Sequence, residues 1–310
     1  MPTIEENQLV WDNAYDWSAA GDEWSGAWGT AEMQWYMTLL PRIHAFLPAP
    51  TILEIAPGFG RWTQFLKDRC DRLVVVDLSE RCIEACKERF RDDAHITYHV
   101  NDGRSLAMVE DHSIDFAFSF DSLVHADASV LQAYLEQLAT KLTPDGVAVL
   151  HHSNSGEYAR SAPLLRKLPG SGKAGSLGLL GAYVRYAPRL RNVPVGRQLL
   201  AGLHRLGLVD LYWRDRTVSA ASFRVQAEAA GLRCASQELI GWLRTRRLID
   251  CISVVTPAGS RWARSTVVVR NPRFMREAEQ ARAIAPAYSL TLTAGARNAP
   301  RATAGTRRVP

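Results

Sequence analysis

Residues 51–60 read Thr-Ile-Leu-Glu-Ile-Ala-Pro-Gly-Phe-Gly, an apolar and β-branched run that breaks into a proline and glycine turn. A helical pattern follows from Arg61 onward. This order predicts a strand, a tight turn and a helix. Glycines at positions 58 and 60 allow a ligand to lie close to the backbone at the helix N-terminus, where a side chain would keep it away. The stretch therefore predicts a site for an adenosine-like ligand, although several kinds of nucleotide site share this element.

The residues beyond the turn distinguish between these kinds of nucleotide site. A dinucleotide fingerprint would place glycine where Thr63 stands, and the Gly-Lys-Ser/Thr of a phosphate-binding loop is absent. A second apolar strand, 73–76, ends in Asp77, where an acid can accept hydrogen bonds from both ribose hydroxyls. A third strand, 95–100, precedes Asp102, which is placed to face an adenine amine.

In this order, the motifs at 54–60, Asp77 and Asp102, followed by the strand 114–120 and the turn 142–146, resemble the class I S-adenosylmethionine-dependent methyltransferases. The resemblance covers roughly residues 30 to 155, and it departs from the family at Ala56, where glycine is usual. It implies S-adenosyl-L-methionine as the cofactor. The positions implied as cofactor-binding are Glu54, Ala56, Gly58, Gly60, Trp62, Asp77, Leu78, Asp102, Gly103 and Phe120.

Strands and helices alternate, which predicts a doubly wound, parallel α/β sheet. The resemblance adds a Rossmann-like, mostly parallel sheet of seven strands with an antiparallel last strand. The predicted segments are an aromatic N-terminal lid (1–30), the cofactor-binding core (31–154), a basic helical insertion or cap after strand five (155–217), the remainder of the core (218–290) and a disordered basic tail (291–310).

The net charge of +5 is unevenly distributed. Residues 157–216 contain eleven Lys/Arg and three acids, and residues 291–310 contain four arginines and no acid. Because the rest of the chain is acidic, the charge does not by itself argue for nucleic-acid binding. Two amphipathic pieces, 179–186 and 198–208, favour a helical cap over the acceptor site. A face for an anionic polymer or lipid surface and a homodimer contact are the alternatives.

Residues 1–30 combine Trp11, Tyr15, Trp17, Trp24 and Trp28 with acids and glycines. One hypothesis is a lid that closes over the cofactor and lines the acceptor pocket, since a tryptophan face can stack on the CH groups of a sugar. The equal alternative is that these rings only pack the segment onto the core.

Methyl transfer to a hydroxyl needs a group that removes the hydroxyl proton. Histidines follow two strand ends, at 125, 151 and 152, and neighbouring strand residues point to opposite faces, so at most one of His151 and His152 faces the acceptor. We predict His152 as the base, with His125 second and Asp121 orienting the acceptor. In another hypothesis Asp121, His152 and Asn154 hold a divalent metal such as Mg, which lowers the pKa of the hydroxyl.

The stretches 16–18, 54–62 and 151–154 also resemble bacterial methyltransferases of polysaccharide and glycoconjugate pathways that methylate sugar hydroxyls. This implies a small-molecule or oligosaccharide acceptor. The alternatives are a lipid or natural-product hydroxyl, or a non-catalytic homologue that binds the cofactor. Residues 118–121 lack the Asn/Asp-Pro-Pro-Tyr/Phe pattern of many nucleic-acid amine methyltransferases. The sequence shows neither a signal peptide nor an apolar run of about 20 residues, which predicts a cytoplasmic protein without a transmembrane segment.

Overall fold

The structure, a computed structural model, describes residues 3–161, 214–242 and 247–288. Within them the chain forms one eight-stranded sheet in the order β3-β2-β1-β4-β5-β7-β6-β8. The strands are β1 (Ala49–Ile55), β2 (Cys70–Asp77), β3 (Ile96–Val100), β4 (Ile114–Ser119), β5 (Leu142–Ser153), β6 (Leu232–Ile240), β7 (Asp250–Pro257) and β8 (Val267–Asn271). The predicted α/β architecture is confirmed.

The strand count was wrong by one. β1 to β5 pair in parallel, and β7 pairs antiparallel with both β5 and β6, so the predicted antiparallel strand is present but lies inside the sheet. The last strand in sequence, β8, runs parallel to β6 and adds an eighth member at the edge. It is held there by its ladder with β6 and by the Asn271 side-chain amide, which donates to Glu238 Oε1 at 2.8 Å.

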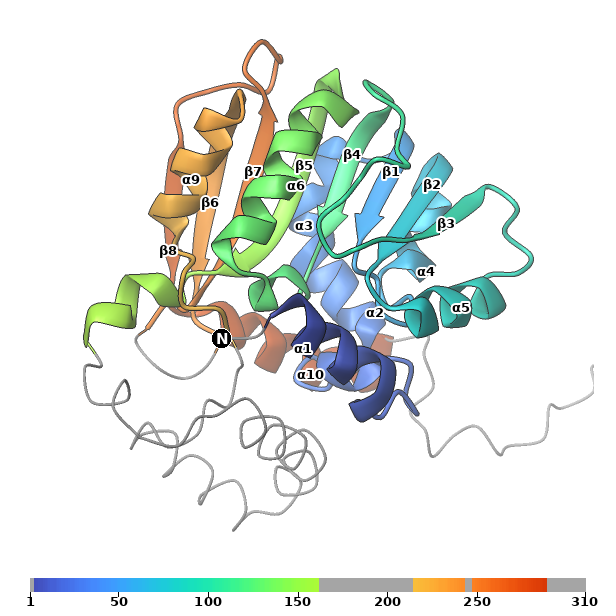
Figure 1. The fold of residues 1–310 in the computed structure, drawn as a ribbon. Helices are drawn as coiled ribbons and strands as arrows, with labels where there is room; N and C mark the ends of the chain where they lie inside the picture. Colours follow the sequence, from blue (N-terminus) through green and yellow to red (C-terminus); the bar gives the residue numbers. More distant parts are fainter. Residues whose placement is uncertain (1–2, 162–213, 243–246, 289–310) are drawn as a thin grey trace, which may run out of the picture.

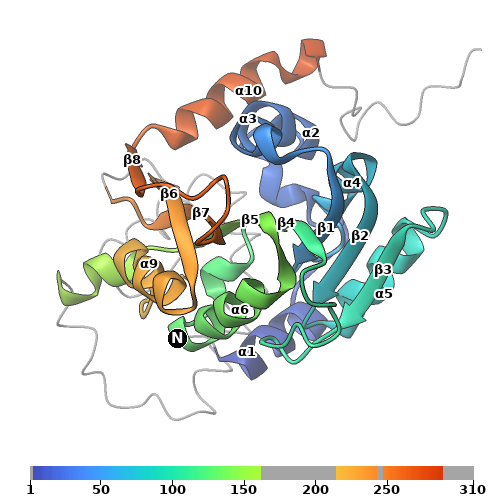
Figure 2. The same cartoon turned by 90° about the horizontal axis from the view of Figure 1, so that it is seen from above.

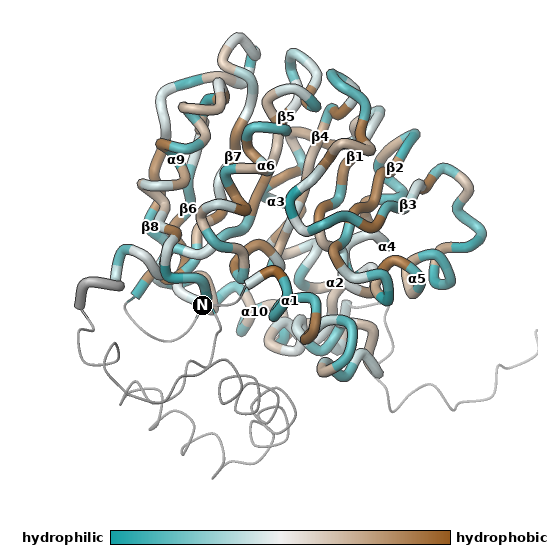
Figure 3. The backbone as a smooth tube through the Cα atoms, viewed as in Figure 1, coloured by the Kyte–Doolittle hydropathy of each residue, from teal (hydrophilic) through white to brown (hydrophobic). Residues whose placement is uncertain are grey.

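Helices cover both faces of the sheet (Figure 2). One face carries α2 (Ala31–Gln34), α3 (Leu40–Ile43), α4 (Thr63–Leu66), α5 (Glu80–Arg89) and α10 (Phe274–Tyr288), and the other carries α6 (Ala128–Lys141) and α9 (Ala220–Ala229). Ile52 packs in the first core and Leu53 in the second, because successive strand side chains point to opposite faces. The central strands are accordingly hydrophobic along most of their length (Figure 3).

Local signals explain most helix boundaries. Thr30 and Ser79 cap α2 and α5, each accepting a backbone N–H with its hydroxyl oxygen. One boundary was predicted wrongly. Residues 142–146 begin β5 instead of forming a separate turn, because Leu142 already pairs with Ile114. α10 continues past Pro286 to Tyr288, since a proline in the last turn removes a hydrogen bond only where the helix is ending.

The N-terminal segment folds against the edge of the sheet toward which the parallel strands point (Figure 1). We call residues 3–25 the roof. It contains α1 (Ile4–Leu9), which begins with a capping box between Thr3 and Glu6, followed by short π and 3-10 turns, η1 (Val10–Ala14) and η2 (Asp22–Ser25).

Most of the predicted basic insertion and all of the predicted tail, including the pieces 179–186 and 198–208, lie outside the described residues. Among the helices that are described, none is both long and apolar enough to cross a bilayer.

Candidate functional site

A pocket lies at the carboxyl ends of β1, β2 and β4, beneath the roof. It contains about 1140 Å³ of space not filled by atoms, part of it open to solvent. The carboxyl edge of an open parallel sheet is where such folds bind ligands. The roof residues that line it are Ile4, Asn7, Trp11, Trp17, Gly21 and Trp24.

The turn after β1 requires its glycines for two different reasons. Gly58 has φ +59°, and a Cβ there would lie 2.9 Å from the Trp17 ring, which covers the turn from the roof. Gly60 has φ +82°, and a Cβ there would lie 2.4 Å from the Phe90 ring in the core. Ala56, where the resembling family has glycine, also adopts a positive φ of 58°, a region that disfavours L-residues. The departure at Ala56 therefore leaves the left-handed turn in place.

Asp77, at the end of β2, faces the pocket beside this turn. Its Oδ1 accepts the Ser79 N–H at 2.8 Å, and its Oδ2 accepts the Gly58 N–H at 3.2 Å. Burial, together with a smaller effect of the Asp12 charge in the roof, raises the pKa of Asp77 from 3.8 to about 7, against the lowering effect of the Ser79 and Gly58 N–H groups. Glu54 lies deeper. Its carboxylate accepts the Thr63 hydroxyl at 2.6 Å, and burial raises its pKa to about 8.

Residues at the end of β3 close one side of the pocket. Gly103 lines it with Leu78, and a Cβ on Gly103 would lie 3.2 Å from Ile4 of the roof. Asp102 is exposed and does not line the pocket. Its carboxylate accepts the backbone N–H groups of Arg104 and Ser105, which hold its pKa below 3.8.

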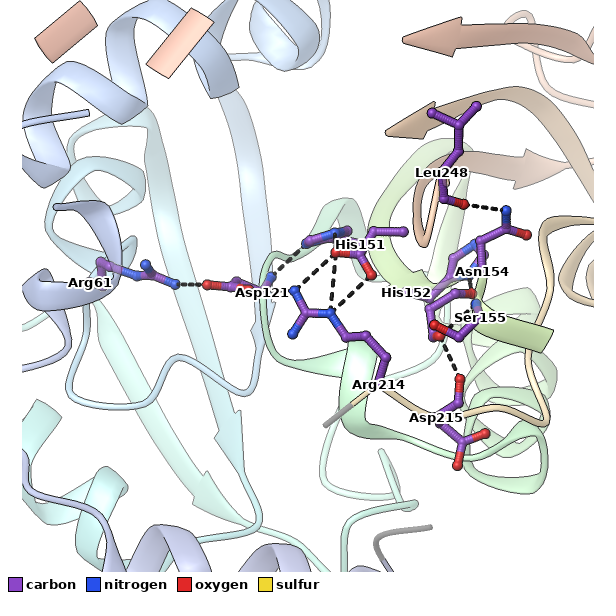
Figure 4. A network of polar contacts seen from close by, with 11 residues as sticks. Arg61, Asp121, His151, His152, Asn154, Ser155, Arg214, Asp215 and Leu248 are labelled. Atoms are coloured by element: carbon purple, nitrogen blue, oxygen red, sulfur yellow. Dashed lines mark hydrogen bonds and ion pairs between the residues drawn. The ribbon is translucent and has the colours of Figure 1, made fainter. Parts of the chain in front are cut away.

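The other side of the pocket ends in a buried ionic network (Figure 4). Arg61 Nη2 donates to Asp121 Oδ2 at 3.0 Å, and Arg214 Nη2 lies 3.6 Å from Asp121 Oδ1. Arg214 also donates from Nε and Nη2 to Asp250 at 2.9–3.2 Å. Although burial alone would raise it, the Arg214 charge helps lower the pKa of Asp250 to about 2. The side chains of Arg61, Asp121 and Arg214 are each less than 10% exposed.

The three predicted histidines have separate environments. His125 lines the pocket, with its ring centroid 5.7 Å from that of Trp11. His151 accepts the Asp121 backbone N–H with Nδ1 at 3.0 Å and stacks on Phe120. His152 stacks on Phe223 at 3.9 Å on the opposite face and bonds Ser253, outside the pocket. Burial lowers the pKa of His152 to about 3.

The proposed metal ligands do not converge. Asp121 is in the pocket network, whereas His152 lies apart from it, beside Ser155 (Figure 4). The His152 ring packs on Phe223. Asn154 donates from its amide nitrogen to the Leu248 carbonyl at 2.7 Å and accepts the Ala220 N–H. In the part of the chain that the structure describes, no three His, Cys, Asp or Glu side chains are grouped to hold a metal. The geometry does not support the Mg hypothesis.

Some of the N-terminal aromatic residues cover the pocket, as the lid hypothesis expects, and others pack onto the core, as its alternative expects. Trp11, Trp17 and Trp24 line the pocket, and Tyr15 stacks on Trp24 at 5.5 Å. Trp28 is instead 1% exposed and packs in the core, donating from Nε1 to the Thr38 hydroxyl. Residues 3–30 thus supply both a cover for the pocket and an anchor for that cover.

Several predicted residues therefore meet in one pocket. Those that line it are Ala56, Gly58, Trp62, Asp77, Leu78, Gly103, Phe120, Asp121 and His125. Those that do not are Glu54, Gly60, Asp102 and His152. Sequence reasoning missed Arg61 and Arg214 as members of the site. Arg61 directly follows the glycine turn and could have been noticed there, whereas Arg214 carries no motif.

Residues 52–146 match a family model described as "Methyltransferase domain". The match spans β1 to the start of β5, including the glycine turn, Asp77 and Asp121. Together with the sheet order, it supports a class I methyltransferase domain with a Rossmann-like α/β fold, of the kind that uses S-adenosylmethionine.

Individual relatives are distant. The chain is 41% identical over 49 residues to ribosomal RNA small subunit methyltransferase A of Geobacter metallireducens, covering 16% of this chain and 18% of that protein. It is 25% identical over 135 residues to nodulation protein S of Sinorhizobium fredii, covering 41% and 59%. The chain thus spans less than two thirds of either curated relative. Among solved structures, the N-methyltransferase NodS from Bradyrhizobium japonicum WM9 is 15% identical, with a TM-score of 0.44 over 73% of this chain and 97% of that one.

Proposed function

We propose that the chain is an S-adenosylmethionine-dependent methyltransferase that methylates a hydroxyl of a sugar or oligosaccharide. The observation that carries the proposal is a single pocket in which the glycine turn and Asp77 lie at the carboxyl edge of the sheet, with His125 and three roof tryptophans around the same space. Gly58 and Asp77 both line this pocket, and Asp77 retains lone pairs for ribose hydroxyls besides those that accept the Gly58 and Ser79 N–H groups. The residues present thus fit the cofactor.

S-adenosylmethionine would supply a methyl group already activated by the positive charge on its sulfur. The chain then has to hold the acceptor in line, and such positioning can lower a barrier by about 7–11 kcal/mol. Asp77 holds the ribose, and the roof covers the site and excludes water.

His125 is our choice of general base, by elimination among the described titratable groups of the pocket. Asp77 lies beside the cofactor turn, and Asp121 is paired with Arg61. Asp127 caps α6, where the Ser129 and Val130 hydrogen bonds lower its pKa against the effect of burial. Burial raises the pKa of the Tyr134 hydroxyl and of the Cys82 thiol above their usual values. A histidine is the remaining group that exchanges protons near neutral pH.

The sugar acceptor is favoured by the chemistry of the roof. Trp11, Trp17 and Trp24 present flat apolar faces to a pocket that also contains charged and hydroxyl groups, and sugars offer both CH faces and hydroxyls. A lipid or natural-product hydroxyl and a non-catalytic role remain the competing functions. The location we propose is the cytoplasm.

The direct test is transfer of labelled methyl groups from S-adenosylmethionine to separate pools of oligosaccharides, lipids and RNA. Label in the glycan pool that is resistant to a chelator is the expected result. Label confined to lipid or RNA would contradict the sugar acceptor. Tight cofactor binding without transfer to any pool would favour the non-catalytic function.

The affinity for S-adenosylhomocysteine should rise with pH. An ionised Asp77 accepts ribose hydroxyls better than a protonated one, and its pKa in the free protein is about 7. Calorimetric titration should therefore show a dissociation constant that falls up to about tenfold per unit between pH 5.5 and 7 and levels off above pH 8. Asp77→Asn should weaken binding about ten- to a hundredfold at pH 8 and flatten this dependence.

Glu54→Gln is the matched control, because the pKa of Glu54, about 8, lies close to that of Asp77 while its side chain is outside the pocket. It should keep the pH dependence. If Asp77→Asn kept the dependence and Glu54→Gln lost it, the assignment of the ribose contact to Asp77 would be wrong.

A further inference from the structure

The Arg61–Asp121 ion pair has an unused donor. Arg61 is 7% exposed, and its Nη2 donates to Asp121, but its Nη1 is buried and has no hydrogen-bond partner among the described residues. An unsatisfied guanidinium nitrogen in a protein interior is unfavourable and calls for a partner. Both side chains line the pocket, so a ligand in the pocket is available to be that partner.

The charges around the pair are balanced. Arg61 and Arg214 face Asp121 and Asp250, two positive groups against two negative ones. His151 adds no charge, because its Nδ1 accepts the Asp121 N–H and must therefore be unprotonated. A group with net negative charge would disturb this balance. A zwitterion would not, because its anionic part can meet Arg61 while its cationic part meets Asp121.

The position of the pair identifies the zwitterion. Arg61 directly follows Gly60 of the glycine turn, and Asp121 follows β4, the strand beside β1. Asp77 accepts the Gly58 N–H from the other side of the same turn. If the ribose of the proposed cofactor lies at Asp77, its amino-acid end extends past the turn toward Arg61.

We propose that Arg61 and Asp121 together bind the amino-acid zwitterion of the cofactor, with Arg61 Nη1 donating to the carboxylate and the Asp121 carboxylate accepting from the ammonium group. This inference rests on the proposed function and assigns Asp121 to the cofactor in place of the acceptor. Arg214 is then a positioning residue that holds Asp121 between itself and Arg61. The positive φ of Asp121, 67°, is consistent with a side chain held at a binding site.

The test compares two probes by calorimetry: S-adenosylhomocysteine, which carries the zwitterion, and 5′-methylthioadenosine, which lacks it. The wild type should bind the first more tightly. Arg61→Gln and Asp121→Asn should each weaken S-adenosylhomocysteine about ten- to a hundredfold and leave 5′-methylthioadenosine within about twofold, because each loses a charged hydrogen bond. Arg61→Lys should restore part of the preference. The ratio of the two affinities is measured on one sample, so partial unfolding does not mimic the effect.

Arg89→Gln is the matched control. Arg89 Nη1 donates to the Phe59 carbonyl in the same turn at 2.9 Å, but its side chain does not line the pocket. It should change both affinities equally, so the ratio stays as in the wild type. An unchanged ratio in Arg61→Gln would overturn the inference, as would a wild type that binds both probes equally. A wild type that binds neither probe would overturn the proposed cofactor and the inference with it.

Discussion

His125→Ala should lower kcat about 10²- to 10⁴-fold, the usual contribution of a positioned general base. The affinity for S-adenosylhomocysteine should stay within about twofold, because the proposed cofactor contacts come from other residues. Single-turnover transfer of labelled methyl groups measures the first quantity, and calorimetry measures the second.

The comparison variant is His152→Ala. His152 is 0% exposed, stacks on Phe223 and has a pKa of about 3, so it stays neutral at the pH of the assay and does not reach the pocket. Its replacement should lower the free energy of unfolding by about 2–4 kcal/mol through the cavity and the lost hydrogen bonds, with kcat per folded molecule nearly unchanged. If His152→Ala lost kcat and His125→Ala stayed active, the general base would be His152, as predicted from the sequence, and not His125.

Gly60→Ala should lower the free energy of unfolding by about 2–5 kcal/mol. A Cβ at this position would lie 2.4 and 2.9 Å from two atoms of the Phe90 ring. Because Phe90 is only 5% exposed, packed core side chains would have to move to make room for it. Overpacking typically costs about 1–3 kcal/mol, and a left-handed L-residue costs about 1–2 kcal/mol more. Urea unfolding followed by circular dichroism measures the loss.

Gly231→Ala separates these two contributions. Gly231 has φ +84°, almost the same as Gly60 at +82°, but a Cβ there would meet nothing within 4 Å. Gly231→Ala should therefore lose only about 1–2 kcal/mol. Equal losses in the two variants would mean that contact with Phe90 contributes nothing and that backbone conformation alone determines the effect.

Local chemistry made much of the fold predictable. The stretch 51–60 specifies strand, turn and helix through its glycines, and Thr30 and Ser79 mark helix starts by their capping hydroxyls. Right-handed crossover connections then leave few possible sheet orders. The pairing of the edge strand β8 was less predictable. β8 joins the sheet through residues of β6 about 30 positions away, and nothing in its own composition specified a parallel partner.

The site was less predictable because side chains distant in sequence build it. Arg61, Asp121, Arg214 and Asp250 come from four separate segments, and no spacing rule connects them. Strand alternation correctly separated His151 from His152, but it could not show that neither of them lines the pocket. Asp102, which the resemblance assigned to adenine, lies outside the pocket lining, and its Oδ1 accepts the backbone N–H groups of Arg104 and Ser105.

The position of the roof at the start of the chain determines when it can pack during synthesis. It is translated before every strand that it covers, and its anchoring partners come much later. The Ser79 hydroxyl donates to Asp12 across 67 positions, and Asn7 donates to the His125 carbonyl across 118. These partners are therefore made well after the three tryptophans of the roof that line the pocket, Trp11, Trp17 and Trp24. The ligand pocket is complete only when Arg214, which also lines it, has been made.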